Sequence, residues 1–291
     1  MLSNIWQQSR LTEGATLEAL EFALGYEFFE GIQTVDVPHA KERQSIGRII
    51  AERDIPLTYC MARVLNLNGL DLSSADKALR PRSVAEIIAR LDDGREINAS
   101  LFHVLSGPKP ESEEERAEAL KRLTDSVASI TEAAAEDPKL TIMIEPLDLG
   151  YHKKMTLGYA REGVEIVKAV RQSYPNIGVG LDTAHMILNG EDSSKELRAS
   201  LEQMVEFHFC NCIMDPSNPL DGDNHVIFGE PGELDVDGIA EVMRAAVDCG
   251  FFNPENRARI FCEIIRRDET PEFIIEHQQK ALEDAWALAN S

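Results

Sequence analysis

The segment Thr141-Ile-Met-Ile-Glu145 is an apolar run of strand length that ends in an ionisable side chain. Three later segments repeat this pattern: Val179-Gly-Leu-Asp182, Val205-Glu-Phe-His208 and Ile260-Phe-Cys-Glu263. Burying a charged side chain in an apolar run costs free energy unless the charge is paired. Four such side chains in succession therefore predict one shared partner. Three carboxylates and an imidazole offer oxygen and nitrogen donors, which suit Mn²⁺, Mg²⁺, Co²⁺ or Zn²⁺ better than a structural, sulfur-bound zinc.

Strand-like and helix-like patterns alternate along the rest of the chain. Apolar runs predict strands at residues 31–37, 57–61, 98–105, 140–144, 177–181, 205–212 and 258–264. Amphipathic patterns predict helices at residues 15–29, 40–54, 83–91, 112–138, 157–170 and 191–204, and two more that begin near residues 235 and 271. This alternation is typical of α/β proteins, in which helices cover a parallel sheet.

The number of strands favours a barrel. A weak eighth strand at residues 5–11 would complete a (β/α)₈ TIM barrel, and we expect residues 1–291 to form one such domain. A doubly wound open sheet is the alternative, but the sequence has no GxGxxG after any predicted strand. A barrel also explains why the polar residues lie at strand carboxyl ends, where barrel active sites are built.

Charge and cysteine content restrict the function and the compartment. The chain has 29 basic and 51 acidic residues, so its formal charge of −22 repels phosphate backbones and anionic membranes. We therefore expect neither nucleic acid nor membrane as a partner. The five cysteines include no CxxC pair, and most lie in apolar runs, which indicates reduced thiols and a cytoplasmic protein. The amino-terminal sequence resembles neither a signal peptide nor a membrane anchor.

The four polar strand ends resemble those of the xylose isomerase-like TIM barrel superfamily, in its group of divalent-metal sugar isomerases and epimerases. Ketose 3-epimerases and hydroxypyruvate isomerase belong to that group. The resemblance spans most of the chain and is most specific between residues 141 and 265. It implies one divalent ion, with Mn²⁺ expected first, held by the residues that match the family ligands: Glu145 in IMIEPLD, Asp182 in GLDTAHM, His208 in EFHFCNC and Glu263 in IFCEII.

The resemblance also implies a mechanism. An ion of this kind acts as a Lewis acid that stabilises an enediolate as it forms from a keto sugar or polyol. Glu145 and Glu263 would be the catalytic acid and base, one removing the proton and the other returning it. His185 matches the family's DxxH and would contact substrate oxygens. His103 lies on a strand where related barrels place a pocket histidine, although a buried core histidine fits that position as well.

The segment after His208 departs from the family pattern. Ketose 3-epimerases tend to carry a basic residue there, whereas this chain continues Cys212-Ile-Met-Asp-Pro and then Asp223-Asn-His225. Asp223 and His225 are candidate substrate contacts, or else part of a solvated loop. Their motif resembles one found in barrels that act on 3-keto sugars, and also the DxH of endonuclease IV.

Three functions therefore remain open for the sequence. The first is a metal-dependent isomerase or epimerase of a small carbohydrate. The second is a lyase or deglycosidase on 3-keto glycosides, which needs the same metal site. The third is an endonuclease IV-like phosphodiesterase, against which stand the charge of −22 and the presence of Cys60 where a second histidine would be needed. The sequence leaves open whether the chain forms a homo-oligomer. Asp36 ends an earlier strand and fits either a helix cap or a salt bridge.

Overall fold

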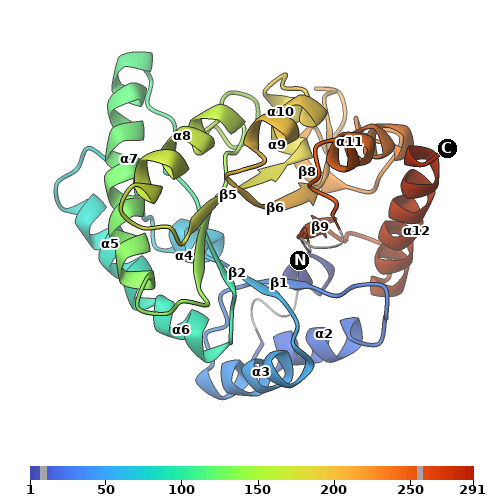
Figure 1. The fold of residues 1–291 in the computed structure, drawn as a ribbon, viewed down its shortest axis with the longest axis horizontal. Helices are drawn as coiled ribbons and strands as arrows, with labels where there is room; N and C mark the ends of the chain where they lie inside the picture. Colours follow the sequence, from blue (N-terminus) through green and yellow to red (C-terminus); the bar gives the residue numbers. More distant parts are fainter. Residues whose placement is uncertain (7–11, 254–257) are drawn as a thin grey trace.

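Parallel strands form a nearly closed barrel in the computed structural model, which describes residues 1–6, 12–253 and 258–291. Within those residues, seven strands pair in the order β1-β2-β3-β4-β5-β6-β9, with helices around the outside (Figure 1). This is a TIM barrel, as the sequence predicts. The strands are β1 (Ile32–Val35), β2 (Leu57–Cys60), β3 (Leu101–Val104), β4 (Thr141–Ile144), β5 (Ile177–Asp182), β6 (Met204–Phe209) and β9 (Ile260–Cys262).

The outer helices bury apolar faces against the barrel. In α7, for example, Leu123, Val127, Ile130 and Ala134 are fully buried, and Ser112 caps its start by accepting a hydrogen bond of 3.1 Å from the Glu115 amide. The larger helices are α2 (Ala15–Ala23), α3 (Ala40–Arg53), α5 (Leu79–Ala89), α7 (Glu113–Ala134), α8 (Ala160–Arg171), α10 (Ser193–Ser200), α11 (Val236–Asp248) and α12 (Pro271–Ala289). Three short helices, α4 (Ala62–Leu67), α6 (Leu91–Glu96) and α9 (Thr183–Leu188), were not predicted as separate elements.

The expected eighth strand is the main correction to the predicted fold. Residues 2–5 form a short helix, α1 (Leu2–Ile5), and residues 7–11 lie outside the described residues. The predicted strand at residues 5–11 is therefore wrong for residues 5 and 6, the part of it that the structure describes. The α1 helix packs against β1, and the Met1 ammonium lies 3.5 Å from the Cys262 carbonyl oxygen. The amino-terminal segment thus occupies the opening between β9 and β1.

A hairpin replaces the long polar connection expected after β6. Strands β7 (Asn211–Ile213) and β8 (Gly222–Val226) pair antiparallel, with Asn211 opposite Val226. They form a separate two-stranded sheet. The hairpin leaves the carboxyl end of β6 and returns Asp223 and His225 to the barrel, where both side chains are buried. The interpretation of these two residues as part of a solvated loop is therefore wrong.

The strand register brings the four polar strand ends to one rim. Asp182, the last residue of β5, pairs directly with His208 near the end of β6. Glu145 follows the last residue of β4, and Glu263 follows the last residue of β9. Because parallel strands share a direction, these side chains gather at the carboxyl face of the barrel.

Two expectations from composition can be compared with the structure. All five cysteines are free thiols, and all but Cys249 are buried, as expected for reduced core cysteines. No helix within the described ranges is both long enough and apolar enough to cross a lipid bilayer.

The first testable prediction concerns Glu191, which accepts a hydrogen bond of 3.1 Å from the Ala160 amide at the start of α8. Burial raises the pKa of this carboxyl to about 7, so the folded state keeps a proton that the unfolded state releases above its ordinary pKa. Wild-type stability should therefore fall as pH rises from about 4.5 to 7 relative to Glu191→Gln, which keeps the acceptor but cannot ionise. Thermal unfolding of both proteins at pH 5 and pH 8 measures this.

The Glu191→Gln variant should match the wild type at pH 5 and be the more stable protein at pH 8. Glu202→Gln changes an exposed glutamate and is the matched control. Equal pH dependence in the wild type and Glu191→Gln would contradict the assigned burial effect.

Candidate active site at the carboxyl rim of the barrel

His208 is the centre of the polar cluster at the rim. Its Nδ1 atom lies 3.1 Å from Glu145 Oε1, 3.8 Å from Asp182 Oδ2 and 3.8 Å from Glu263 Oε1. All four side chains are at least nine-tenths buried. The four residues predicted as a ligand set from the sequence are thus brought together by four different strands of the barrel.

Unpaired atoms in this cluster fit a bound cation. Neither His208 Nδ1 nor Asp182 Oδ2 has a hydrogen-bond partner, although both are buried. Buried polar atoms without partners are rare and costly in native proteins. His208 Nδ1 faces three carboxylates at 3 to 4 Å but makes no hydrogen bond with them. The nitrogen is therefore well placed to bind a divalent ion together with these carboxylates.

Glu206 holds the opposite side of the His208 ring. Its Oε1 atom lies 2.7 Å from His208 Nε2, and its Oε2 atom accepts a hydrogen bond of 2.5 Å from Thr58 Oγ1. A carboxylate beside Nε2 stabilises the tautomer that has its proton on Nε2. This tautomer leaves the Nδ1 lone pair free to bind a metal. Glu206 is fully buried, so the arrangement resembles the carboxylate–histidine–metal sets of other metalloproteins.

Each predicted catalytic glutamate has its own histidine neighbour. His103 Nε2 lies 2.9 Å from Glu145 Oε2, and His225 Nδ1 lies 3.4 Å from Glu263 Oε2. Burial acts to raise the pKa of Glu145, but the charges of His103 and His208 hold it well below its usual value. Burial is likewise outweighed at Glu263, where His225 and His208 lower the pKa to about 2. Both carboxylates are therefore ionised at neutral pH.

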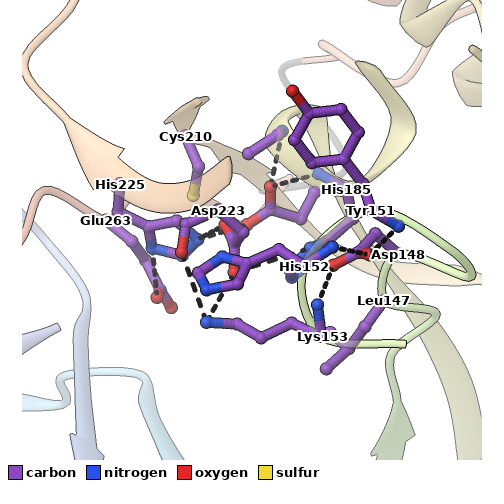
Figure 2. A network of polar contacts seen from close by, with 12 residues as sticks. Leu147, Asp148, Tyr151, His152, Lys153, His185, Cys210, Asp223, His225 and Glu263 are labelled. Atoms are coloured by element: carbon purple, nitrogen blue, oxygen red, sulfur yellow. Dashed lines mark hydrogen bonds and ion pairs between the residues drawn. The ribbon is translucent and has the colours of Figure 1, made fainter. Parts of the chain in front are cut away.

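A second group of side chains lies beside the first. His225 Nε2 lies 2.8 Å from Asp223 Oδ1, and Lys153 Nζ lies 2.9 Å from Asp223 Oδ2. Figure 2 shows the Lys153 side chain reaching from the loop after β4 toward Asp223. His185 Nδ1 is 3.9 Å from the same carboxylate. His225 adopts φ 43°, a left-handed conformation that is uncommon for residues other than glycine and often marks functional sites.

Donor atoms also converge in smaller groups among the described residues. Three sets of three have their donor atoms within 4.8 Å of one another: Asp182, Cys210 and His225; His185, Asp223 and His225; and Glu145, Asp182 and His185. Asp182 belongs to two of them and also to the predicted ligand set. Burial, and then the charges of Asp182 and Glu263, raise the pKa of the Cys210 thiol well above its usual value. A neutral thiol is a poor ligand for oxygen-preferring ions.

Several of these side chains line a pocket of about 300 Å³, although Asp182 and His208 are not part of its lining. The volume lies at the lower end of the range for small-molecule sites. Asp36, which the sequence left between a helix cap and a salt bridge, forms an ion pair of 2.8 Å with Arg63, and Arg63 lies at the pocket rim. The lining includes His103, Glu145, Lys153, His185, Asp223, His225 and Glu263.

Sequence reasoning missed two residues of this site. Glu206 alternates with His208 on the same strand, so its position two residues earlier was a usable signal that both side chains face inward. Lys153 follows β4 by several residues and carries no local pattern. Only the path of that loop shows that Lys153 reaches Asp223 in the site.

The chain belongs to the xylose isomerase-like TIM barrel family. The sequence profile of that family matches residues 19–285, which include every strand of the barrel and all the rim residues described above. Membership is consistent with an enzyme of the sugar isomerase and epimerase type. No curated protein sequence matches the chain.

Solved structures agree with this fold. A D-tagatose 3-epimerase-like protein is 15% identical over 94% of each chain, with a TM-score of 0.72. The IolI protein with a bound zinc atom is 15% identical over 97% of this chain and 95% of its own, with a TM-score of 0.70. The 3-keto-D-glucoside 4-epimerase YcjR from E. coli is 13% identical over 93% of this chain and 94% of its own, with a TM-score of 0.66.

The second testable prediction concerns Glu206→Gln. An amide can donate to His208 Nε2 and so favour the tautomer with the proton on Nδ1, which cannot bind a metal. Affinity for Mn²⁺, measured by titration of the metal-free protein, should therefore fall about 10- to 100-fold. Asp182→Asn, which changes a ligand itself, should lose more, and Glu202→Gln should bind like the wild type. Unchanged affinity in Glu206→Gln would show that Glu206 does not orient the histidine.

Proposed function

We propose that the protein is a divalent-metal-dependent isomerase or epimerase of a small keto sugar or polyol. Glu145, Asp182, His208 and Glu263 would hold one ion, with Mn²⁺ as the expected metal and Mg²⁺, Co²⁺ or Zn²⁺ as alternatives. The observation that carries this proposal is the approach of His208 Nδ1 to within 4 Å of all three carboxylates, with no hydrogen bond made by that nitrogen.

The pocket supports a small polar substrate. Its volume of about 300 Å³ and its lining of ionisable side chains suit a compact, hydroxyl-rich molecule better than a large apolar one. A divalent ion at the four ligands would supply Lewis-acid polarisation of a carbonyl and its neighbouring hydroxyl. His185 and His225 lie on the side of the pocket next to Asp182 and would orient these oxygens by hydrogen bonds.

Glu145 and Glu263 are placed to move a proton. The strand order puts β5 and β6 between β4 and β9, so the two glutamates approach the pocket from different sides. One carboxylate would remove the proton next to the carbonyl. The other would first take a proton from the histidine beside it and would then return that proton to the opposite face for epimerisation or to the adjacent carbon for isomerisation. His103 and His225 each contact one of these carboxylates and would set the direction in which it points.

A lyase acting on 3-keto glycosides is the alternative proposal. It would use the same first step, removal of a proton next to a carbonyl, and would then expel the substituent at the β-carbon. The similarity in fold to YcjR supports 3-keto glycosides as candidate substrates, because that protein is a 3-keto-D-glucoside 4-epimerase. Product analysis separates the two, since only the lyase releases an aglycone or an unsaturated sugar.

The third testable prediction concerns the two glutamates. Incubation in D₂O with Mn²⁺ and a panel of ketopentoses, ketohexoses and 3-keto glucosides should place solvent deuterium on one carbon of the true substrate, as read by NMR. Glu145→Gln and Glu263→Gln, assayed at metal concentrations that restore occupancy, should each exchange about 10²- to 10⁴-fold more slowly because proton transfer is lost. The exposed Glu202→Gln is the control.

Two outcomes would count against this function. Absence of exchange with every keto sugar in metal-loaded wild-type protein would remove the isomerase and lyase proposals together. Near wild-type exchange in both metal-loaded glutamine variants would leave the glutamates as ligands only.

The fourth testable prediction concerns Lys153 as a substrate contact. Its ammonium lies at the pocket beside Asp223, where it would donate to substrate oxygens in place of the basic residue that ketose 3-epimerases carry after the metal-binding histidine. Lys153→Met should retain the metal and lower kcat/KM about tenfold, the effect of losing one hydrogen bond from a charged group. Lys153→Arg should recover part of that loss.

Lys154→Met is the matched control, because Lys154 is exposed and does not line the pocket. Equal kcat/KM for Lys153→Met and Lys154→Met would assign Lys153 to the surface of the loop and not to the substrate.

A further inference from the structure

A second cavity lies at the opposite end of the barrel from the active site. It has a volume of about 640 Å³ and is lined at its base by Gly31, Pro56 and Ile260, which stand at the amino-terminal ends of β1, β2 and β9. Helices α2 and α12 flank this side of the barrel (Figure 1). The pocket at the carboxyl rim is lined by other residues, and Met1 is the one described residue common to both linings.

Most of the cavity is apolar. Aromatic and aliphatic side chains from α1, α12 and the segment before β1 supply its walls, and the exposed rings of Phe28 and Trp286 stand at its edge, with 38% and 45% of their surface accessible. Exposed large aromatic side chains beside a concave apolar surface are typical of a ligand site.

Two polar side chains in the lining have buried atoms that make no hydrogen bond. Gln33 is only 1% exposed, and neither its amide oxygen nor its amide nitrogen has a hydrogen bond. The Nη1 atom of Arg259 is also buried without a partner. A buried amide and a buried guanidinium nitrogen left unsatisfied each cost free energy, and native proteins seldom tolerate such groups without a ligand, ion or water to satisfy them.

The same two residues lie one layer below the metal-ligand histidine. Gln33 pairs in register with Thr58, and the Arg259 carbonyl oxygen accepts a hydrogen bond of 3.0 Å from the Phe207 amide. Glu206, whose charge acts to raise the pKa of Arg259, already binds Thr58 and His208 with its two oxygens. Arg259 therefore contributes to the cavity lining a guanidinium whose buried Nη1 atom makes no hydrogen bond.

We propose that this cavity binds a monocarboxylate with an apolar tail of medium length. The carboxylate would accept from Arg259 Nη1 and the Gln33 amide nitrogen, and the tail would lie along the apolar walls toward Trp286. A guanidinium and a carboxylate form a strong, charge-assisted pair. Glu30 and Glu283 also line the cavity and disfavour a dianion such as a phosphate monoester. The site is independent of the proposed sugar chemistry.

The experiment compares three probes by isothermal titration against the full-length protein: octanoate, 1-octanol and hexyl phosphate. Octanoate should bind saturably at one site per chain, about tenfold or more tightly than 1-octanol, because only octanoate pairs with Arg259. Hexyl phosphate should bind more weakly than octanoate. No saturable octanoate binding, or equal affinity for octanoate and 1-octanol, would overturn the proposal.

Substitutions test whether octanoate binds in this cavity. Arg259→Met should weaken octanoate binding about 10- to 100-fold, while the affinity for 1-octanol stays within a few-fold. Arg48→Met removes an arginine from a shallow surface pocket near α3 and should bind octanoate like the wild type. If Arg48→Met loses octanoate and Arg259→Met does not, the anion site lies elsewhere and the proposal fails.

A variant at the edge of the cavity keeps the test decisive if Arg259→Met does not fold. Trp286 is 45% exposed, so Trp286→Ala should fold, as circular dichroism and thermal unfolding would report. It should weaken octanoate and 1-octanol alike, because it removes apolar contact and no charge. Unchanged affinity for both probes would overturn the proposed position of the tail.

Discussion

The contact of His208 with its carboxylate neighbours is the constraint on which the site depends. One ring nitrogen is held by Glu206, and the other faces Glu145, Asp182 and Glu263. Four acidic groups around one imidazole in a buried place would repel one another strongly in the absence of positive charge. The arrangement is stable only where cations balance it, whether protonated histidines or a bound metal.

The barrel makes that arrangement available by its register. Parallel strands of similar length end at one face, and the direct pairing of Asp182 with His208 fixes two of the four groups side by side. The hairpin β7–β8 then brings Asp223 and His225 back over the same face, and Arg267 anchors it by donating a hydrogen bond of 2.6 Å to the Asn224 carbonyl oxygen. Side chains on regular strands are held more rigidly than those on free loops, which suits a site that must position a proton donor and acceptor.

The two ends of the barrel differ in chemistry. The carboxyl rim is crowded with ionisable side chains. The amino end is mostly apolar and contains buried atoms of Gln33 and Arg259 that make no hydrogen bond. Within the described residues, β9 and β1 are the two ends of the sheet, and the short α1 helix packs against β1. The apolar cavity at the base lies among α1, α12 and the strand starts.

The sequence by itself determined the order of the seven barrel strands and of the larger helices, and the identity of the four rim residues. Those features rest on local periodicity and on ionisable residues in apolar runs, which are visible in one dimension. Only the tertiary structure placed Lys153 against Asp223, assigned Glu206 to His208, and paired His103 with Glu145. These contacts join residues from different loops and strands, and their geometry follows from register and loop path, which local sequence patterns do not encode. The separation of β9 from β1 in the described sheet is also visible only in the tertiary structure, because barrel closure depends on pairing between strands from the two ends of the chain.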